Sequence, residues 1–408
     1  MSPCEDFQSV ISPTPVERFA SLYWEKKALH ISRGTPGYFG SLFSVEQLDR
    51  LINVSFTNLG LFMFEGERVI TPRLRRPTKT TLSEFYKEFA SGKSICLRDM
   101  QVRWKPITQL VSAVARESGF SVTAELVATP PRSRNAGIFA DSRSLIVLQL
   151  EGAATWHLPA GRFQPLASAQ EGTSPENQEH AGAVSLRPGD TLYLPYGNAP
   201  GTGASGAAAL PMVETGDGHA LHLVLTIQRV TWADLLARTV AVASGKNVEL
   251  RRALGFGGPL SVSGRGQMES RFRELVAQAF DSPSWKEANH LLASEHSRRL
   301  PILSDGHFDL LRHVDSVGLE TEVIRRPGVE GRVQLYDGVV ELIFPGYYYQ
   351  APEKVYLALD FISETRQFKV KDIPGWYTDQ ERIALTRQLI SMGVLTFVTP
   401  PGSAPTPG

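Results

Sequence analysis

The spacing of hydrophobic positions changes along the chain, and each change predicts a different kind of secondary structure. In the first segment Phe19, Leu22 and Tyr23 recur at helical spacing. They predict an amphipathic helix that begins at Pro15, with Thr14 as its cap. One face of this helix is therefore expected to lie against a core.

Two more elements complete the N-terminal segment. Residues 28–31 form a short apolar run that predicts a strand. Residues 38–51 predict a second helix, with Ser44 as its cap and Gln47 completing a capping box.

From about residue 94 the hydrophobic period shortens to two, and Gly and Pro separate the runs. The predicted strands are 121–126, 144–150, 183–186, 191–194 and 220–228. Several short strands at close spacing favour a sandwich or barrel. Two segments interrupt this pattern and predict mobile loops. The first, 167–182, is rich in polar residues. The second, 197–218, is rich in Gly and Ala and would suit a lid.

Beyond residue 230 the pattern turns helical and then mixed. The predicted helices are 232–243, 269–280, 285–299, 353–363 and 378–392. The predicted strands are 333–336, 338–344 and 395–398. Helices followed by a β-wing are typical of a winged-helix domain, and the Pro- and Gly-rich residues 400–408 predict a disordered tail.

Composition narrows the classes of function. The chain has 408 residues, with 42 Lys and Arg against 42 Asp and Glu. This balance argues against nucleic acid as a partner. No apolar run approaches the roughly 20 residues of a membrane span. The first residues lack the apolar core of a signal peptide, and Cys4 and Cys96 stand far apart. We therefore expect a soluble protein of the reducing cytoplasm.

Three stretches, taken in order, resemble the JmjC ribosomal-oxygenase family of cupin-type 2-oxoglutarate/Fe(II) oxygenases. The first is Phe19 followed by Tyr23-Trp24-Glu25 and Ala28-Leu29-His30-Ile31. The second is Thr129-Pro130-Pro131 followed by Leu148-Gln149-Leu150-Glu151-Gly152 and Trp156. The third is Leu186-Arg187-Pro188-Gly189-Asp190 with Thr191-Leu192-Tyr193-Leu194-Pro195, then Leu221-His222-Leu223 and Thr231-Trp232.

This resemblance covers roughly residues 16–400 and implies an α+β fold with three parts. They are a JmjC-type double-stranded β-helix, or cupin, core with N-terminal helices at 1–230, a helical dimerisation segment at 231–300, and a C-terminal winged-helix domain at 301–399.

The resemblance also implies where iron would be held, and this sequence departs from the family there. The family places two His and one carboxylate on one face of Fe(II). Its first His corresponds to Phe139, its carboxylate to Asp141 and its second His to a position near Pro200. Only Asp141 can bind a metal, and one carboxylate does not hold Fe(II) alone.

The co-substrate site departs in the same way. Where the family has a Lys or Arg for 2-oxoglutarate, this chain has Ala153-Ala154-Thr155. The family's Asn-x-Tyr corresponds to Glu125 and Val127, and its Ser to Ala220. Glu125 would repel a dianion. We expect no cofactor, with Fe(II) and 2-oxoglutarate binding only if the altered site still accepts them.

Three functions stay open. The first is a pseudo-oxygenase that binds a peptide or protein partner, as a homodimer or as a heterodimer with an active relative. The second is a repurposed tailoring enzyme that acts on a peptide or small metabolite, with Glu125, Asp141 and His222 as catalytic groups. The third is an iron hydroxylase with non-standard ligands, for which the set would be Asp141, His219 and His222. Arg132 and Arg134 are expected at the pocket mouth, where they would meet an acidic ligand.

Overall fold

The chain divides into two compact units, residues 1–229 with 301–303 and residues 230–300 with 304–408. The computed structural model describes residues 6–55, 61–65, 68–70, 79–136, 143–158, 167–168, 182–195, 212–254, 265–280, 282–301, 306–326, 329, 332–336, 338–344, 347–375 and 377–398.

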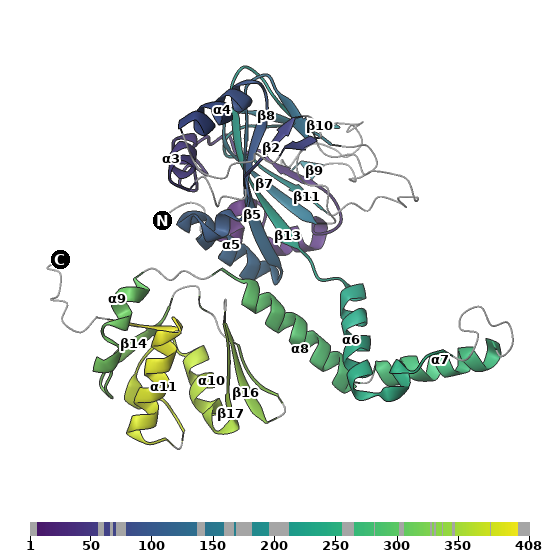
Figure 1. The fold of residues 1–408 in the computed structure, drawn as a ribbon, viewed down its shortest axis with the longest axis vertical. Helices are drawn as coiled ribbons and strands as arrows, with labels where there is room; N and C mark the ends of the chain where they lie inside the picture. The colour runs from purple at the N-terminus through teal and green to yellow at the C-terminus, as the bar shows by residue number, and fades with distance from the viewer. Residues whose placement is uncertain are drawn as a thin grey trace. The chain divides into compact units, whose positions relative to one another are not determined.

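Within the first unit the described strands pair into two sheets (Figure 1). In spatial order the nine-stranded sheet holds β3 (Arg68–Ile70), β2 (Leu61–Glu65), β4 (Ser94–Leu97), β5 (Ser121–Thr129), β13 (Ala220–Gln228), β7 (Ser144–Glu151), β11 (Thr191–Leu194), β1 (Leu29–Ile31) and β9 (Ala167–Ser168). The four-stranded sheet holds β10 (Ala183–Leu186), β8 (Ala154–His157), β12 (Met212–Thr215) and β6 (Arg134–Ala136).

The core of this unit lies between the two sheets. Side chains at alternate positions of a strand share one face, and those of both sheets that face inward form one apolar cluster. Its members include Cys96, Val127, Leu145, Val147, Ala154, Trp156, Val184, Leu186, Leu192, Leu194, Val213, Ala220 and Val224. The predicted strands at 121–126, 144–150, 183–186, 191–194 and 220–228 are all confirmed, and so is the cupin-type barrel.

Helices cover the outside of this barrel. They are α1 (Phe7–Ile11), α2 (Val16–Leu22), α3 (Val45–Ser55), α4 (Lys79–Ala90), η1 (Met100–Val102) and α5 (Lys105–Ser118). Helix α5 carries Pro106 in its first turn and ends at Gly119, whose φ of 74° closes the last turn. Its apolar face packs on β5 (Figure 1). Strands β7 and β13 are consequently buried on both faces.

Two predictions about the N-terminal helices need correction. Helix α2 begins at Val16, so Pro15 lies outside it, and the Val16 amide donates to Gln8 Oε1 at 3.2 Å. The cap is therefore supplied by α1 and not by Thr14. The predicted helix over 38–51 begins only at Val45, because residues 38–42 fold as tight turns.

The capping box at the start of α3 is confirmed. The Ser44 amide donates to Gln47 Oε1 at 2.9 Å, and the Gln47 amide donates to Ser44 Oγ at 3.3 Å. The sequence signal thus marked the true start of the helix, although the apolar spacing had placed it earlier.

The two predicted loops are each interrupted by a strand. Residues 167–168 form β9 beside β1, and residues 212–215 form β12 between β6 and β8. The prediction of a loop was wrong for these residues, because their backbone is paired. Residues 169–181 and 196–211 lie outside the described residues, and so does the predicted tail at 400–408.

The second unit begins with helices. They are α6 (Trp232–Lys246), η3 (Val248–Arg251), α7 (Arg265–Ala279) and α8 (Ser282–Arg299). Thr231 and Asp234 form a capping box at the start of α6. His290 on α8 contacts Glu341 through Nε2 at 2.5 Å, and both side chains are largely buried. This pair ties α8 to β16, so His290 has a structural role.

The remainder of the second unit combines short helices with two small sheets (Figure 1). The helices are α9 (His307–Leu311), η5 (Val314–Ser316), η6 (Glu353–Val355), α10 (Tyr356–Glu364), η7 (Val370–Asp372) and α11 (Asp379–Ser391). The sheets are β18 (Gln367–Lys369), β14 (Glu322–Arg325) and β19 (Leu395–Phe397), and β15 (Arg332–Tyr336), β16 (Val339–Phe344) and β17 (Tyr347–Pro352). The winged-helix assignment and the domain boundaries stay predictions.

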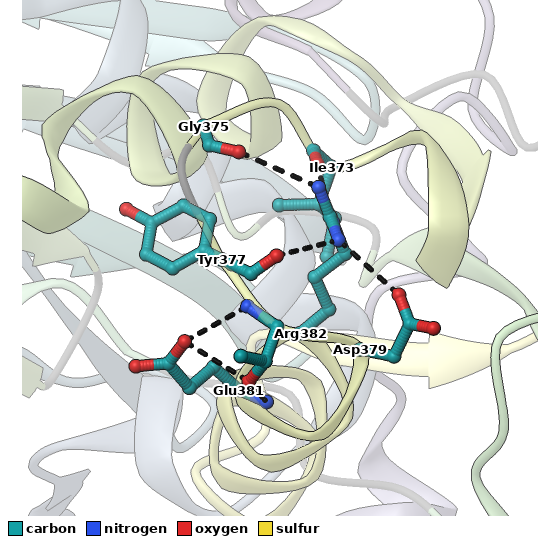
Figure 2. A network of polar contacts seen from close by, with 7 residues as sticks. Ile373, Gly375, Tyr377, Asp379, Glu381 and Arg382 are labelled. Carbon is teal, nitrogen blue, oxygen red and sulfur yellow. Dashed lines mark hydrogen bonds and ion pairs between the residues drawn. The ribbon is translucent and has the colours of Figure 1, made fainter.

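Arg382 on α11 organises the loop that precedes this helix. Its guanidinium donates to the carbonyl oxygens of Ile373 at 2.9 Å, Tyr377 at 2.9 Å and Gly375 at 3.4 Å, and it lies 3.4 Å from Asp379 (Figure 2). A planar guanidinium suits such a fan of acceptors. The loop forms one wall of a surface hollow of about 310 Å³ lined by Leu335, Glu353, Lys354, Tyr356, Leu357 and Gly375.

None of the helices among the described residues is long and apolar enough to span a membrane.

Candidate functional site

The inner face of the barrel is where the sequence placed its candidate chemistry. Strand register identifies the side chains that face inward there. His222 on β13 lies opposite Val127 on β5, and Val127 belongs to the inner cluster. Glu125, two residues before Val127, therefore faces the same way. Asp141 lies outside the described residues, so only two of the three predicted catalytic groups can be placed.

His222 is completely buried and neutral. Its ring meets Trp156 edge to face, with centroids 5.2 Å apart and planes at 70°. Burial lowers the pKa of His222 to about 3, since an imidazolium in this apolar interior would lose its hydration. Within the described part of the chain, neither ring nitrogen has a hydrogen-bond partner.

Gln149 is a site residue that the sequence reasoning missed. It lies opposite His222 on β7, next to a register shift at Leu221, and it is fully buried. Its Nε2 donates to the carbonyl oxygens of Glu151 at 3.0 Å and Gly152 at 3.1 Å. Its Oε1 accepts no hydrogen bond from the described residues. The available signal was its place on the inward face after Leu145 and Val147.

Glu125 engages a different partner. Its carboxylate lies 3.5 Å from Nε of Arg98, and the Glu125 side chain is 15% exposed. Glu125 and His222 share a face of the sheet, and their predicted catalytic roles stay predictions.

Among the positions that the resemblance assigns to 2-oxoglutarate binding, Val127, Ala154 and Ala220 are apolar, whereas Glu125 is acidic. Ala154 and Ala220 are buried in the inner cluster beside Trp156. In the described ranges, no three His, Cys, Asp or Glu side chains gather closely enough to share a metal ion. Phe139, Asp141 and Pro200 lie outside those ranges, and their chemistry is known from the sequence alone.

His219 and His157 lie near the ends of inner strands, away from the buried face. His219 is about half exposed, and its Nε2 is 3.8 Å from Glu151. His157 contacts Glu214 at 2.8 Å on the outer face of the four-stranded sheet, between its central strands β8 and β12. His219 is thus partly exposed whereas His222 is buried. Because Asp141 lies outside the described residues, the predicted metal set of Asp141, His219 and His222 stays a prediction.

Arg132 and Arg134 lie at the start of β6. Arg132 has φ of 51° and forms an exposed ion pair with Asp217 at 2.8 Å. Arg134 is exposed and lies opposite Glu214 on β12. Acidic residues of this chain therefore already face both positions. Their predicted role toward an acidic ligand stays a prediction.

The motif Arg187-Pro188-Gly189-Asp190 has a structural role. Asp190 is 2% exposed, and its carboxylate accepts from the backbone amides of Arg33 at 3.0 Å and Arg187 at 2.9 Å. Gly189 has φ of 95°, and an added Cβ would meet the Thr35 carbonyl oxygen at 2.3 Å. This motif fixes the turn into β11 and does not contribute chemistry to the barrel.

Comparison with protein families and known structures supports the fold. A model described as the JmjC domain matches residues 99–210. Escherichia coli ribosomal oxygenase YcfD superposes with a TM-score of 0.55 at 14% identity, covering 94% of this chain and 98% of that chain. At this identity the likeness shows the fold alone. Another structure of the same protein is described as a complex with cobalt and 2-oxoglutarate.

The chain is also similar to curated proteins. A bifunctional lysine-specific demethylase and histidyl-hydroxylase NO66 from Aedes aegypti is 30% identical over 332 residues, which cover 74% of this chain and 49% of that protein. Ribosomal oxygenase 1 from Homo sapiens is 28% identical over 261 residues, which cover 61% of this chain and 39% of that protein. The chain thus spans about half of these relatives or less.

Proposed function

Because the chain belongs to the JmjC ribosomal-oxygenase family, we propose that it uses the barrel to bind a peptide or protein and does not oxidise a substrate with Fe(II) and 2-oxoglutarate. The observation that carries this proposal is the apolar inner face around Ala154, Trp156 and the neutral His222. A dicarboxylate such as 2-oxoglutarate needs a cationic side chain beside it when it is buried in an apolar interior.

The residues of this chain do not fit the family's metal and co-substrate. Phe139 and Pro200 offer no metal-binding atom, and Ala154 and Ala220 offer neither charge nor hydroxyl. Glu125 adds a negative charge to the same face, although Arg98 lies beside it. The acid–base alternative is less favoured, because the Glu125 carboxylate lies beside Arg98 and His222 is a fully buried ring.

A polypeptide partner is supported by the names of the relatives. A lysine-specific demethylase and histidyl-hydroxylase acts on amino-acid residues, as its name states. A scaffold that keeps the frame of such an enzyme and lacks its charged groups retains binding more readily than catalysis.

An assay of co-substrate turnover tests the proposal. With Fe(II), ascorbate and 2-oxoglutarate, the wild-type chain is expected to release succinate only at the background rate. Escherichia coli YcfD, assayed in parallel, is the positive control. Stoichiometric Fe(II) binding accompanied by decarboxylation of 2-oxoglutarate would contradict the proposal and would favour an iron hydroxylase with non-standard ligands.

We further propose that the helical segment pairs with a second copy of this chain. Trp232, Leu236 and Val240 on α6 follow one another at four-residue spacing and are 81%, 49% and 40% exposed. Residues at this spacing form one row on a helix. An apolar row of this kind on a soluble protein marks an interface.

Charge placed in this row is expected to weaken the pairing. In sedimentation equilibrium, Trp232→Glu should shift the wild-type dimer toward monomer and raise its dissociation constant by at least about tenfold. Ala241→Glu, an exposed position on the other side of the same helix, is the matched control and should remain dimeric. A monomeric wild type, or equal behaviour of both variants, would reject this interface.

A further inference from the structure

Two fully buried polar side chains face one another inside the barrel with unused hydrogen-bonding atoms. Gln149 and His222 are directly opposed on β7 and β13, and both are 0% exposed. Residues so paired have Cβ atoms about 5 Å apart. Among the described residues, nothing bonds to Gln149 Oε1 or to either nitrogen of His222.

Such a group of unpaired atoms is unusual in a native interior. Buried polar atoms nearly always have a partner in the protein or in ordered water, because an unmet hydrogen bond costs the solvation that the atom lost. Gln149 Oε1 can only accept a hydrogen bond, whereas a neutral imidazole offers one donor and one acceptor. Together the two side chains present complementary atoms to a single small group.

The surroundings determine which group fits. Val127, Val147, Ala154 and Trp156 surround the pair with apolar surface, and Glu125, on the same face, already lies beside Arg98. An ion brought here would lose its hydration without a counter-charge. An uncharged group with one donor and one acceptor loses little hydration free energy on entering this interior. It can form hydrogen bonds with both Gln149 and His222.

We propose that Gln149 and His222 form an internal binding site for an uncharged hydrogen-bonding group, such as a primary amide or a hydroxyl. This site specifies the binding role proposed above. It rests on that proposed function, in which 2-oxoglutarate does not occupy the barrel. The turnover assay tests that role, whereas the titration below tests this site, so the two can fail separately.

Acetamide and acetate test the site, because they share a shape and differ in charge. The full chain, labelled with ¹⁵N-histidine, is titrated with each probe while the imidazole ¹⁵N signals are recorded. His222 is recognised as the ring that stays neutral at pH 5. The other eight histidines act as internal references.

Acetamide is expected to shift the His222 signals in a saturable manner, with a dissociation constant at least tenfold lower than that of acetate. His222→Phe should lose acetamide binding, and His157→Phe, the same substitution at a partly exposed histidine outside the inner cluster, should keep it. Should His222→Phe fail to fold, the wild-type comparison of the two probes still decides. Equal or tighter binding of acetate would overturn the proposal, and so would a His222 signal that neither probe moves.

Discussion

Acidification from pH 6.5 to pH 4.5 is expected to lower the free energy of unfolding by about 2 kcal/mol through His222 alone. The pKa of His222 is about 3 in the folded chain and 6.5 in the unfolded chain. Between these values the unfolded chain binds a proton that the folded chain does not. Stability therefore falls as the pH falls through this window, and well above pH 6.5 His222 contributes no pH dependence.

Urea unfolding at several pH values measures this effect. His222→Phe keeps a ring against Trp156 and removes the titrating group. The difference between wild type and variant should be nearly constant from pH 7 to pH 8 and should change by about 2 kcal/mol between pH 6.5 and pH 4.5. Carboxylates, which also respond to acid, cancel in this difference. Parallel curves over the acidic range would show that the imidazole is not held neutral.

Gly152→Ala is expected to cost about 3 kcal/mol of stability or more, among the largest effects for so small a change. Gly152 has φ of +62°, and an added Cβ would lie 1.8 Å from the His219 carbonyl oxygen. The neighbour is backbone and cannot rotate away. The turn after β7 would have to move away from the start of β13. This movement would disturb the pairing that places Gln149 on β7 opposite His222 on β13.

Gly34→Ala is the matched control for this substitution. Gly34 has a nearly identical φ of +63°, but nothing lies within 4 Å of the added Cβ. Its cost should be only the conformational penalty of about 1 kcal/mol. Thermal unfolding of both variants separates backbone conformation from steric contact. Similar melting temperatures for the two would refute the close approach at Gly152.

Six of the described barrel strands, β1, β5, β7, β10, β11 and β13, could be predicted because the run of apolar positions in a strand is a local property. Strand β12 was missed because Met212–Thr215 ends a stretch rich in Gly and Ala, whose composition favours a loop. Its pairing with β6 and β8 supplies the hydrogen bonds that local propensity does not. The start of α2 was misplaced for a similar reason, since its cap comes from Gln8 on another helix.

The candidate site could be predicted only in part. The resemblance placed Glu125 and His222 on neighbouring strands, and the register confirms that they share a face. It did not reveal that Arg98 would lie beside Glu125 or that Gln149 would face His222. The second pairing depends on a register shift at Leu221 between strands far apart in the chain, and no local pattern encodes such a shift.

The position of β13 has a consequence for synthesis of the chain on the ribosome. This strand lies between β5 and β7 but is made after both of them. Until residues 220–228 leave the exit tunnel, β5 and β7 each present an unpaired apolar edge, which is a template for wrong pairing. A nascent chain paused before residue 220 is therefore expected to depend on a chaperone, whereas one that has passed residue 228 can close its barrel.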